Sequence, residues 1–246
     1  MTDPIHHAGA DASAHNYYLL NRPVFTIVIP THRPDRPIAR TLRSIARQET
    51  RQGDLVLVVG DIHSMDLPDV AEIVRGFDNE TLRGYQTGNI DGARYRYLPF
   101  DGQVHDWGHS QLNHGIASAP FGSWIMCQDD DDVYLPGAFR AIRGTIEQYA
   151  VDAILSPLMF RFLAPWREET GRTRQVIWKT PELIQDNVGG HCLVVPNRPG
   201  MVGKYTSRYA GDYDWIVDTL KRWETIGQPA RWVDQVITCC RPDTGP

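Results

Sequence analysis

The segment Ser123-Trp124-Ile125-Met126-Cys127-Gln128-Asp129-Asp130-Asp131-Asp132-Val133-Tyr134-Leu135-Pro136 places four consecutive aspartates directly after an apolar run. The run from Trp124 to Cys127 is typical of a buried strand, and Pro136 suits the first turn of a following helix. Open α/β sheets bind their ligands at the carboxyl ends of their strands. The segment therefore predicts a strand, then an acidic binding loop, then a helix.

The four aspartates are candidates for a cation site. In an extended segment the side chains of Asp129 and Asp131 point to one side and that of Asp130 to the other. Two oxygen donors on one face suit Mg²⁺ or Mn²⁺ bound together with substrate phosphates. A solvated acidic loop, or a helix N-terminus that favours negative charge, explains the run as well, so both interpretations stay open at this point.

The composition favours one large α/β domain. The chain has 246 residues, 41% of them hydrophobic, and a net charge of −5, which gives no overall attraction to nucleic acid or an anionic membrane. Its four cysteines show no paired metal-binding spacing, and two are adjacent, which indicates reduced thiols packed in a core. No apolar run reaches transmembrane length, and no signal pattern is found near the start. We therefore expect a cytoplasmic protein with a flexible leader over residues 1–21.

Strands and helices alternate from residue 24 onward. Residues 24–29 and 55–59 are β-branched runs of the kind that is buried on both faces of a sheet. Between them, Ile38, Leu42 and Ile45 form an apolar stripe at helical spacing. This βαβ unit predicts a parallel sheet with a right-handed crossover. We expect a single domain over residues 22–246, with a mostly parallel twisted sheet flanked by helices.

The later elements follow from the same patterns. Strands are expected over 95–98, 153–162, 192–195 and 232–240, helices over 111–119, 136–149 and 212–226, and a hairpin or mobile loop over 166–174. The last helix should bury Ile216, Leu220 and Trp223. We expect residues 22–132 to form a Rossmann-like nucleotide-binding half and residues 133–246 an acceptor-side half.

Polar loops follow three of the expected strands, at residues 31–33, 61–66 and 129–132. In a doubly wound sheet these loops converge on one edge, where they could hold a nucleotide. The chain has neither a GxGxxG pattern nor a P-loop lysine, which argues against a dinucleotide dehydrogenase and a P-loop kinase. A cation held by the aspartates is then the natural way to bind a diphosphate.

The chain resembles the inverting, family-2-type glycosyltransferases of the glycosyltransferase-A fold. Five motifs carry the resemblance, in the family's order: Pro30-Thr31-His32-Arg33 ("IPTxNR"), Val59 to Asp66 ("VDDGSxD"), Asn113 to Ala119 ("NxGxxxA"), Gln128 to Pro136 ("LDxDDxxxP") and Gly211 to Trp215 ("EDxDL"). Each motif alone is weak, but their order over most of the chain is specific. The resemblance implies a nucleotide-diphosphate sugar donor, with a UDP-sugar favoured, and Mn²⁺ or Mg²⁺ as cofactor.

The resemblance also implies roles for individual residues. Asp131 would ligate the metal, and Asp129 would contact the ribose or the metal. The remaining nucleotide-binding candidates are Thr31, Arg33, Asp61, Asn113 and Asp130. His191, which follows two glycines, is a candidate metal or acceptor ligand, with a satisfied structural histidine as the alternative.

Asp212 would be the general base that deprotonates the acceptor hydroxyl. Because Asp is also a favoured helix N-cap, a structural role would explain it too. The chain departs from the family pattern at Gly211, which replaces the usual Glu, so Asp214 competes for the role. Leu112 stands where the family commonly has an arginine, and Gln111 or His109 is a candidate replacement.

The expected activity is transfer of a hexosyl group to an acceptor hydroxyl. One candidate acceptor is a hydroxymethylated DNA base of the phage type, because the segment 161–179 is basic and aromatic, although the chain as a whole is acidic. Two alternatives remain: a nucleotidyltransferase or pyrophosphorylase, and a nucleotide-sugar-binding module without turnover.

Overall fold

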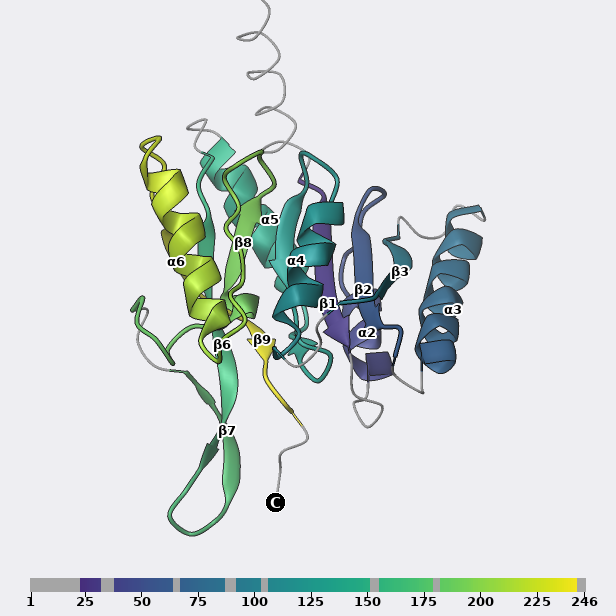
Figure 1. Cartoon of the computed structure of the whole chain (residues 1–246), viewed down its shortest axis with the longest axis horizontal. Helices are drawn as coiled ribbons and strands as arrows, with labels where there is room; N and C mark the ends of the chain where they lie inside the picture. Colours follow the sequence, from purple (N-terminus) through teal and green to yellow (C-terminus); the bar gives the residue numbers. More distant parts are fainter. Residues whose placement is uncertain are drawn as a thin grey trace, which may run out of the picture.

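The computed structural model describes residues 23–31, 38–63, 67–86, 92–102, 106–150, 155–178 and 182–242. One sheet runs through the molecule in the order β3-β2-β1-β4-β8-β6-β9-β5, with β7 paired to β6 (Figure 1). The strands are β1 (Phe25–Thr31), β2 (Leu55–Asp61), β3 (Arg94–Phe100), β4 (Trp124–Cys127), β5 (Val133–Tyr134), β6 (Leu158–Arg167), β7 (Thr173–Ile177), β8 (Leu193–Pro196) and β9 (Arg231–Cys239). The helices are α2 (Ile38–Ala46), α3 (Leu67–Gln86), α4 (His109–Ser118), α5 (Ala138–Ala150) and α6 (Gly211–Glu224), with a short 3₁₀ turn η1 (Gly190–Cys192).

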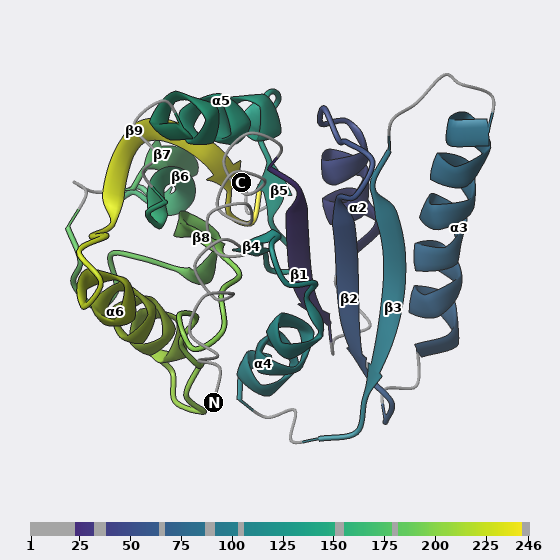
Figure 2. The ribbon, with the colours of Figure 1, turned by 90° about the horizontal axis from the view of Figure 1, so that it is seen from above.

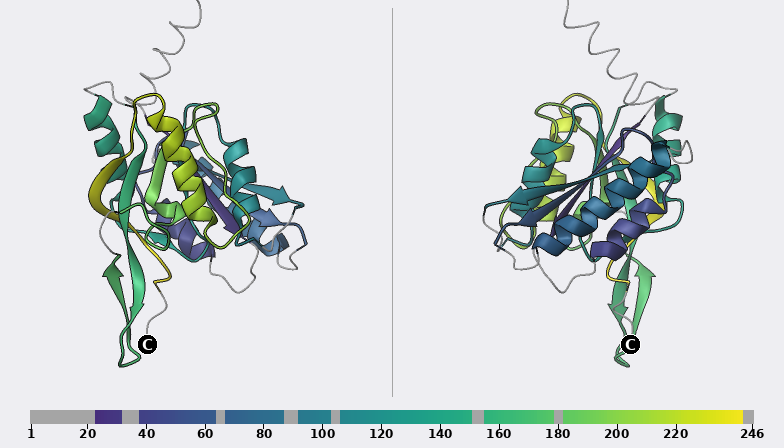
Figure 3. Two further views of the ribbon diagram at one scale, coloured as in Figure 1. Left: turned by 60° about the vertical axis from the view of Figure 1, so that its left-hand side comes forward. Right: turned by 90° about the vertical axis from the view of Figure 1, so that its right-hand side faces the viewer.

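The first half of the sheet is parallel. β1 pairs in parallel with β2 and β4, and β2 pairs in parallel with β3. Every residue of β1, β2 and β4 is buried, because helices cover both faces. Helices α2 and α3 lie side by side on one face, and α4 packs on β1 and β2 from the other (Figures 2 and 3). At that contact Gly115 lets α4 approach closely, since a Cβ there would lie 2.3 Å from a methyl group of Val28.

The second half of the sheet is mixed. β8 runs antiparallel to both β4 and β6, whereas β9 runs parallel to β6 with shifts of register around Arg161. β6 and β7 form a hairpin that projects from the body of the molecule (Figure 1). The two-residue strand β5 pairs with the end of β9, which joins Val133 to Cys239. This last pairing brings the C-terminal strand next to the acidic loop.

The α/β fold with a mixed, mostly parallel sheet flanked by helices confirms the expected fold class. The predicted apolar stripe of α2 is confirmed as well, since Ile38, Leu42 and Ile45 are all buried. In α6, Ile216 and Trp223 are buried and Leu220 packs at the edge of the core. The expected leader lies outside the described residues, and the division into two halves at residue 132 stays a prediction.

Helix α3 was not expected from the sequence. It contains two glycines, Gly76 and Gly84, which lower helix propensity, and Val74 is its most deeply buried hydrophobic residue among those described. Strand β6 begins at Leu158, and the polar segment after it is a hairpin, one of the two expected forms. Within the described part of the chain, no helix is both long and apolar enough to span a membrane.

Candidate active site

A cleft of about 440 Å³ opens where the acidic loop after β4 meets the second half of the sheet. Its walls come from regions that are far apart in the sequence, including Cys240 and Arg241 after β9. Lining residues include Trp107 and His109 before and at the start of α4, Asp129 and Asp132 from the acidic loop, His191 from η1, Tyr209 and Asp212 around the start of α6, and Phe162, Ala164 and Trp178 from the hairpin region.

Asp129 and Asp212 both line this cleft. The pKa of Asp212 is raised to about 7, mainly because the carboxylate is desolvated and also because the negative charge of Asp129 is near. The backbone N–H of Gly190 donates a hydrogen bond to Asp212 and partly opposes this shift. The Asp212 side chain keeps 40% of its exposure, so it remains accessible from the cleft. A carboxyl group with this pKa can exchange protons near neutral pH.

His109 lies behind Asp212. Its Nε2 is 4.0 Å from Asp212 Oδ1, and its ring stacks on Tyr205, which stacks in turn on the buried Trp215. Burial lowers the pKa of His109, although nearby Asp106 opposes this, so its imidazole is predominantly neutral at pH 7. The sequence offered His109 as a replacement for the family's arginine, and that role stays a prediction.

Gly190, the second of the two glycines before His191, leaves room for its neighbours that a side chain would take. A Cβ on Gly190 would lie 2.5 Å from the hydroxyl of Tyr205 and 3.3 Å from Asp212 Oδ1. A side chain at this position would therefore push against the first turn of α6. The glycine lets its own backbone N–H reach the Asp212 carboxylate.

The acidic loop is a turn rather than an extended segment. The backbone N–H of Asp132 donates to the carbonyl of Asp129 at 3.3 Å, and Thr41 on α2 donates to the carbonyls of Asp130 and Asp132. As a result Asp129 and Asp132 line the cleft. The expectation that Asp129 and Asp131 share one face of an extended strand is therefore wrong. The chain turns over these four residues, so side chains two positions apart no longer share one face.

The other two aspartates lie away from the cleft lining. Asp130 is buried, and its side chain is 3% exposed. Asp131 has a carboxylate oxygen 3.7 Å from Nε of Arg241, the residue after Cys240. Metal binding by Asp131 and nucleotide binding by Asp130 stay predictions.

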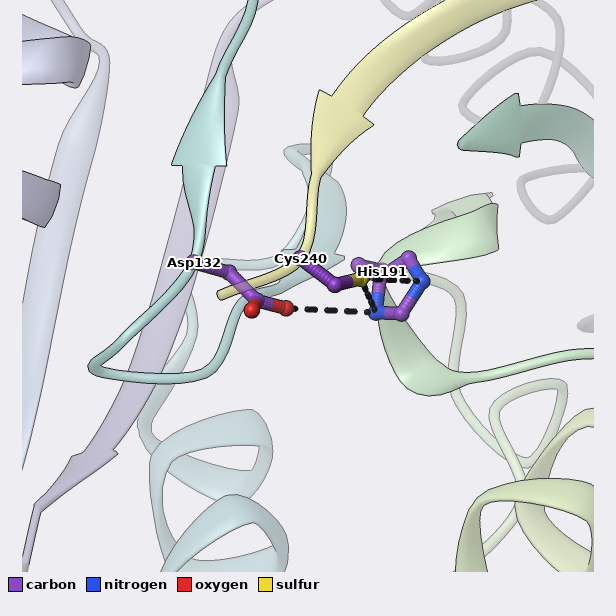
Figure 4. A group of neighbouring side chains, drawn as sticks. All are labelled: Asp132, His191 and Cys240. Carbon is purple, nitrogen blue, oxygen red and sulfur yellow. Dashed lines mark hydrogen bonds and ion pairs between the residues drawn. The ribbon is translucent and has the colours of Figure 1, made fainter. Parts of the chain in front are cut away.

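Asp132, His191 and Cys240 all line the cleft. Their side chains form a compact group (Figure 4). His191 Nδ1 lies 3.6 Å from Asp132 Oδ2, and Cys240 Sγ lies 3.4 Å from His191 Nε2 and 3.9 Å from Nδ1. Burial lowers the pKa of His191 to about 4, so its ring is neutral. Burial, reinforced by nearby aspartates, raises the pKa of both Asp132 and Cys240. The sequence named His191 but gave no signal for Cys240, because the pairing of β5 with β9 is long-range.

Two of the remaining nucleotide-binding candidates, Thr31 and Asp61, lie at strand ends, and Asn113 lies in α4. Thr31 ends β1, and its carbonyl accepts a hydrogen bond from Gln111 at 2.8 Å. Asp61 ends β2, and Oδ1 accepts the backbone N–H of His63 at 2.9 Å. Asn113 uses both polar groups of its amide on the backbone of Tyr205, which is a structural contact. Arg33 lies outside the described residues. Nucleotide binding by all four stays a prediction.

Comparison with known proteins identifies the family. The model of the family described as "Glycosyl transferase family 2" matches residues 26–205, nearly three quarters of the chain. The chain belongs to glycosyl transferase family 2. No curated protein sequence matches it.

The fold of this family-2 chain is similar to that of several solved structures. S. aureus TarS has 13% identity and a TM-score of 0.60, over 88% of this chain and 36% of TarS. A TarS fragment, residues 1–349 in complex with UDP, has 13% identity and a TM-score of 0.59, over 88% of this chain and 60% of the fragment. The mannosyltransferase PcManGT from Pyrobaculum calidifontis, in complex with GDP-Man and Mn²⁺, has 14% identity and a TM-score of 0.55, over 96% of this chain and 68% of that one. The family-2 chain thus spans little more than a third of full TarS.

The donor set of this family-2 site fits a divalent cation. Asp129 and Asp132 bring carboxylate oxygens to the cleft, and His191 brings a neutral imidazole. Carboxylates suit Mg²⁺ and Mn²⁺, and imidazole suits the transition metals. The cleft therefore holds the types of atom that a metal-dependent glycosyltransferase needs.

Proposed function

We propose that the chain is a metal-dependent inverting glycosyltransferase, which moves a hexosyl group from a nucleotide-diphosphate sugar to an acceptor hydroxyl. A UDP-sugar is the favoured donor. One observation carries the proposal: Asp129 and Asp212 line the same cleft, and the pKa of Asp212 is raised to about 7. An inverting transfer needs a carboxylate base on the acceptor side and a charge-neutralising group at the leaving diphosphate.

The donor is placed against the carboxyl ends of β1, β2 and β4. Thr31, Asp61 and Asp129 stand at the ends of these adjacent strands, where open α/β sheets bind nucleotides. The comparisons support such a donor because the TarS fragment contains UDP and PcManGT contains GDP-Man. When bound, a divalent cation would supply charge neutralisation for the leaving diphosphate. Asp129, Asp132 and His191 are the cleft residues that would hold it, beside the predicted ligand Asp131.

Asp212 serves as the general base. A base works best when its pKa lies near the working pH, because it is then both deprotonated and basic enough. The competing candidate Asp214 is poorly suited, since hydrogen bonds from Arg208 and Thr206 hold its pKa below the usual value. His109 Nε2 lies 4.0 Å from the Asp212 carboxylate, too far for a hydrogen bond, and its ring forms part of the cleft wall beside it.

The acceptor enters between the start of α6 and the β6–β7 hairpin. Trp107 and Tyr209 are both more than half exposed beside Asp212, and Trp166 is exposed on the hairpin. Aromatic rings of this kind stack on sugar rings and on bases. A hydroxymethylated DNA base stays a prediction, because two of the basic residues of this region, Arg161 and Arg174, are already paired with Asp234 and Glu168. Binding to DNA that weakens steeply with salt would support it, and indifference to DNA would remove it.

The experiment is a transfer assay with UDP- and GDP-sugars, with and without Mn²⁺, on the wild type and on Asp212→Asn and Asp214→Asn. The proposal predicts metal-dependent release of nucleoside diphosphate by the wild type and by Asp214→Asn, and its loss in Asp212→Asn. Full activity of Asp212→Asn would favour a nucleotide-sugar-binding role without this base. Release of pyrophosphate in place of nucleoside diphosphate would favour a nucleotidyltransferase.

A further inference from the structure

We propose that Asp132, His191 and Cys240 form a binding site for a thiophilic divalent cation of the Zn²⁺ class. The three side chains come from the acidic loop, from η1 and from the residue after β9 (Figure 4). Asp132 and His191 are also among the cleft residues proposed to hold the donor's cation, so this inference rests on the proposed function and deepens it: it adds Cys240 as a ligand and names the class of cation.

The three side chains lie close enough together to share one cation, and Cys240 Sγ also lies at hydrogen-bonding distance, 3.4 Å, from His191 Nε2. Zn–N bonds of about 2.0–2.1 Å and a Zn–S bond of about 2.3 Å put neighbouring ligand atoms of a tetrahedral site about 3.4–3.6 Å apart. His191 Nδ1 is 3.6 Å from Asp132 Oδ2 and 3.9 Å from Cys240 Sγ, and one ligand atom from each of the three residues lies within 4.8 Å of the others. A hydrogen bond between nitrogen and oxygen would be about 2.7–3.2 Å long. Small side-chain movements would close the three atoms around one ion through Nδ1 of His191.

The chemistry of the donor set selects the cation. One carboxylate oxygen, one imidazole nitrogen and one sulfur form a mixed set that Zn²⁺ commonly accepts, whereas a thiolate does not suit Mg²⁺. The cysteine binds as a thiolate, so its proton is released to solvent when the cation enters. The proposed site therefore shares Asp132 and His191 with the site proposed for the donor's cation and differs from it in the sulfur ligand, which selects a thiophilic cation.

The surroundings hold two of the ligands in place. The backbone N–H of Arg241 donates to Asp132 Oδ1 at 2.9 Å, which leaves Oδ2 directed towards His191. The ring of Phe162 packs edge-on against the ring of His191, with centroids 4.5 Å apart. Outer contacts of this type orient metal ligands and strengthen binding. Because all three ligand residues line the cleft, the fourth coordination position faces the cavity.

The test uses Co²⁺ as a spectroscopic substitute for Zn²⁺. Full-length protein, freed of metal with a chelator, is titrated with Co²⁺ in the absence of nucleotide, and then with Zn²⁺. The proposal predicts one Co²⁺ per chain, a near-ultraviolet thiolate-to-cobalt absorption band, and displacement of Co²⁺ by Zn²⁺. Cys240→Ser should abolish the band. His191→Ala should weaken binding by more than the roughly 10–100-fold that loss of an outer-shell partner costs.

Cys239→Ser is the matched control, since Cys239 is the preceding residue on β9 and is also buried. It should keep the band and the stoichiometry. Cys240→His guards against misfolding of the serine variant, because it should keep Co²⁺ binding and lose only the thiolate band. The absence of a thiolate band in the wild type, or its survival in Cys240→Ser, would overturn the proposal. Cys240→Ser changes the only one of the three ligands that is not assigned to the donor's cation, so its transfer activity with Mn²⁺ reports separately on the proposed function.

Discussion

The two halves of the sheet differ in how their residues reach the cleft. In the parallel half, β1, β2 and β4 run in the same direction, and each presents a polar residue at or just after its own carboxyl end. In the mixed half, β8, β6 and β9 pair across long stretches of chain, and their residues meet only because β9 returns beside the acidic loop. The first half thus presents Thr31, Asp61 and Asp129 at one edge of the sheet. The second half supplies the proposed base, Asp212, and the remaining cleft walls, so it determines how the acceptor is bound and deprotonated.

The largest expected effect tests this division at Asp212. Asp212→Asn keeps the shape of the side chain and removes the base, so transfer should fall by roughly 10²–10⁴-fold. Asp214→Asn should cost far less, because that carboxylate is tied to Arg208 outside the reaction. Steady-state kinetics of both variants measure the difference. An equal loss in the two variants would break the assignment of the base to Asp212.

The second prediction compares ion pairs in the two halves. Asp54, at the start of the parallel half, is fully buried beside Arg143 and also accepts the backbone N–H of Phe25 at 2.8 Å. Asp54→Ala should lower the free energy of unfolding by about 3–5 kcal/mol, because it leaves a buried guanidinium without its partner. The pair of Asp234 with Arg161, on the mixed half, is exposed at Asp234, so Asp234→Ala should cost only about 0–1 kcal/mol. Urea unfolding gives both values, and similar values would contradict this account.

The third prediction concerns the turn that carries His191. Gly190→Ala would place a methyl group 2.5 Å from the Tyr205 hydroxyl, and such overpacking costs about 1–3 kcal/mol. Transfer should fall as well, because the same methyl group lies against Asp212. Gly144→Ala in α5 is the control, since a Cβ there has open space and a helix interior favours Ala over Gly by about 0.5–1 kcal/mol. Gly190→Ala should therefore lower both the melting temperature and the transfer rate. Gly144→Ala should raise the melting temperature or leave it unchanged, and should not change the transfer rate.

The smallest expected effect is on pH dependence. Because the folded-state pKa of Asp212 is about 7, kcat/KM should rise with pH and reach half its maximum near pH 7. The folded chain holds this proton to a higher pH than the unfolded chain, so the free energy of unfolding should fall as pH rises from about 4 to about 7. Asp212→Asn should remove that component of the pH dependence of stability. A profile of kcat/KM that is flat from pH 5 to 8 would show that Asp212 is not the titrating base.

Sequence patterns predicted the parallel half well, because its signals are local. The stripe of Ile38, Leu42 and Ile45 and the buried runs of β1 and β2 repeat at the periods that helices and strands require. Helix α3 was missed although its sequence carries an apolar stripe at helical spacing that packs on the core, formed by Val70, Ile73, Val74 and Phe77. Asp132 was not singled out because a hydrogen-bonded turn replaced the expected extended geometry. Cys240 could not be placed beside it, since the contact depends on the pairing of β5 with β9 across more than 100 residues.

The central claim is that the carboxylates after β4 hold the donor diphosphate through a divalent cation while Asp212, in the same cleft, acts on the acceptor. Calorimetric titration of UDP and GDP in the presence of Mn²⁺, on the wild type, Asp129→Asn and Asp212→Asn, tests it most directly. The account predicts that Asp129→Asn loses nucleotide binding and that Asp212→Asn binds the nucleotide as the wild type does. Normal nucleotide binding by Asp129→Asn, or its loss in Asp212→Asn alone, would contradict the account.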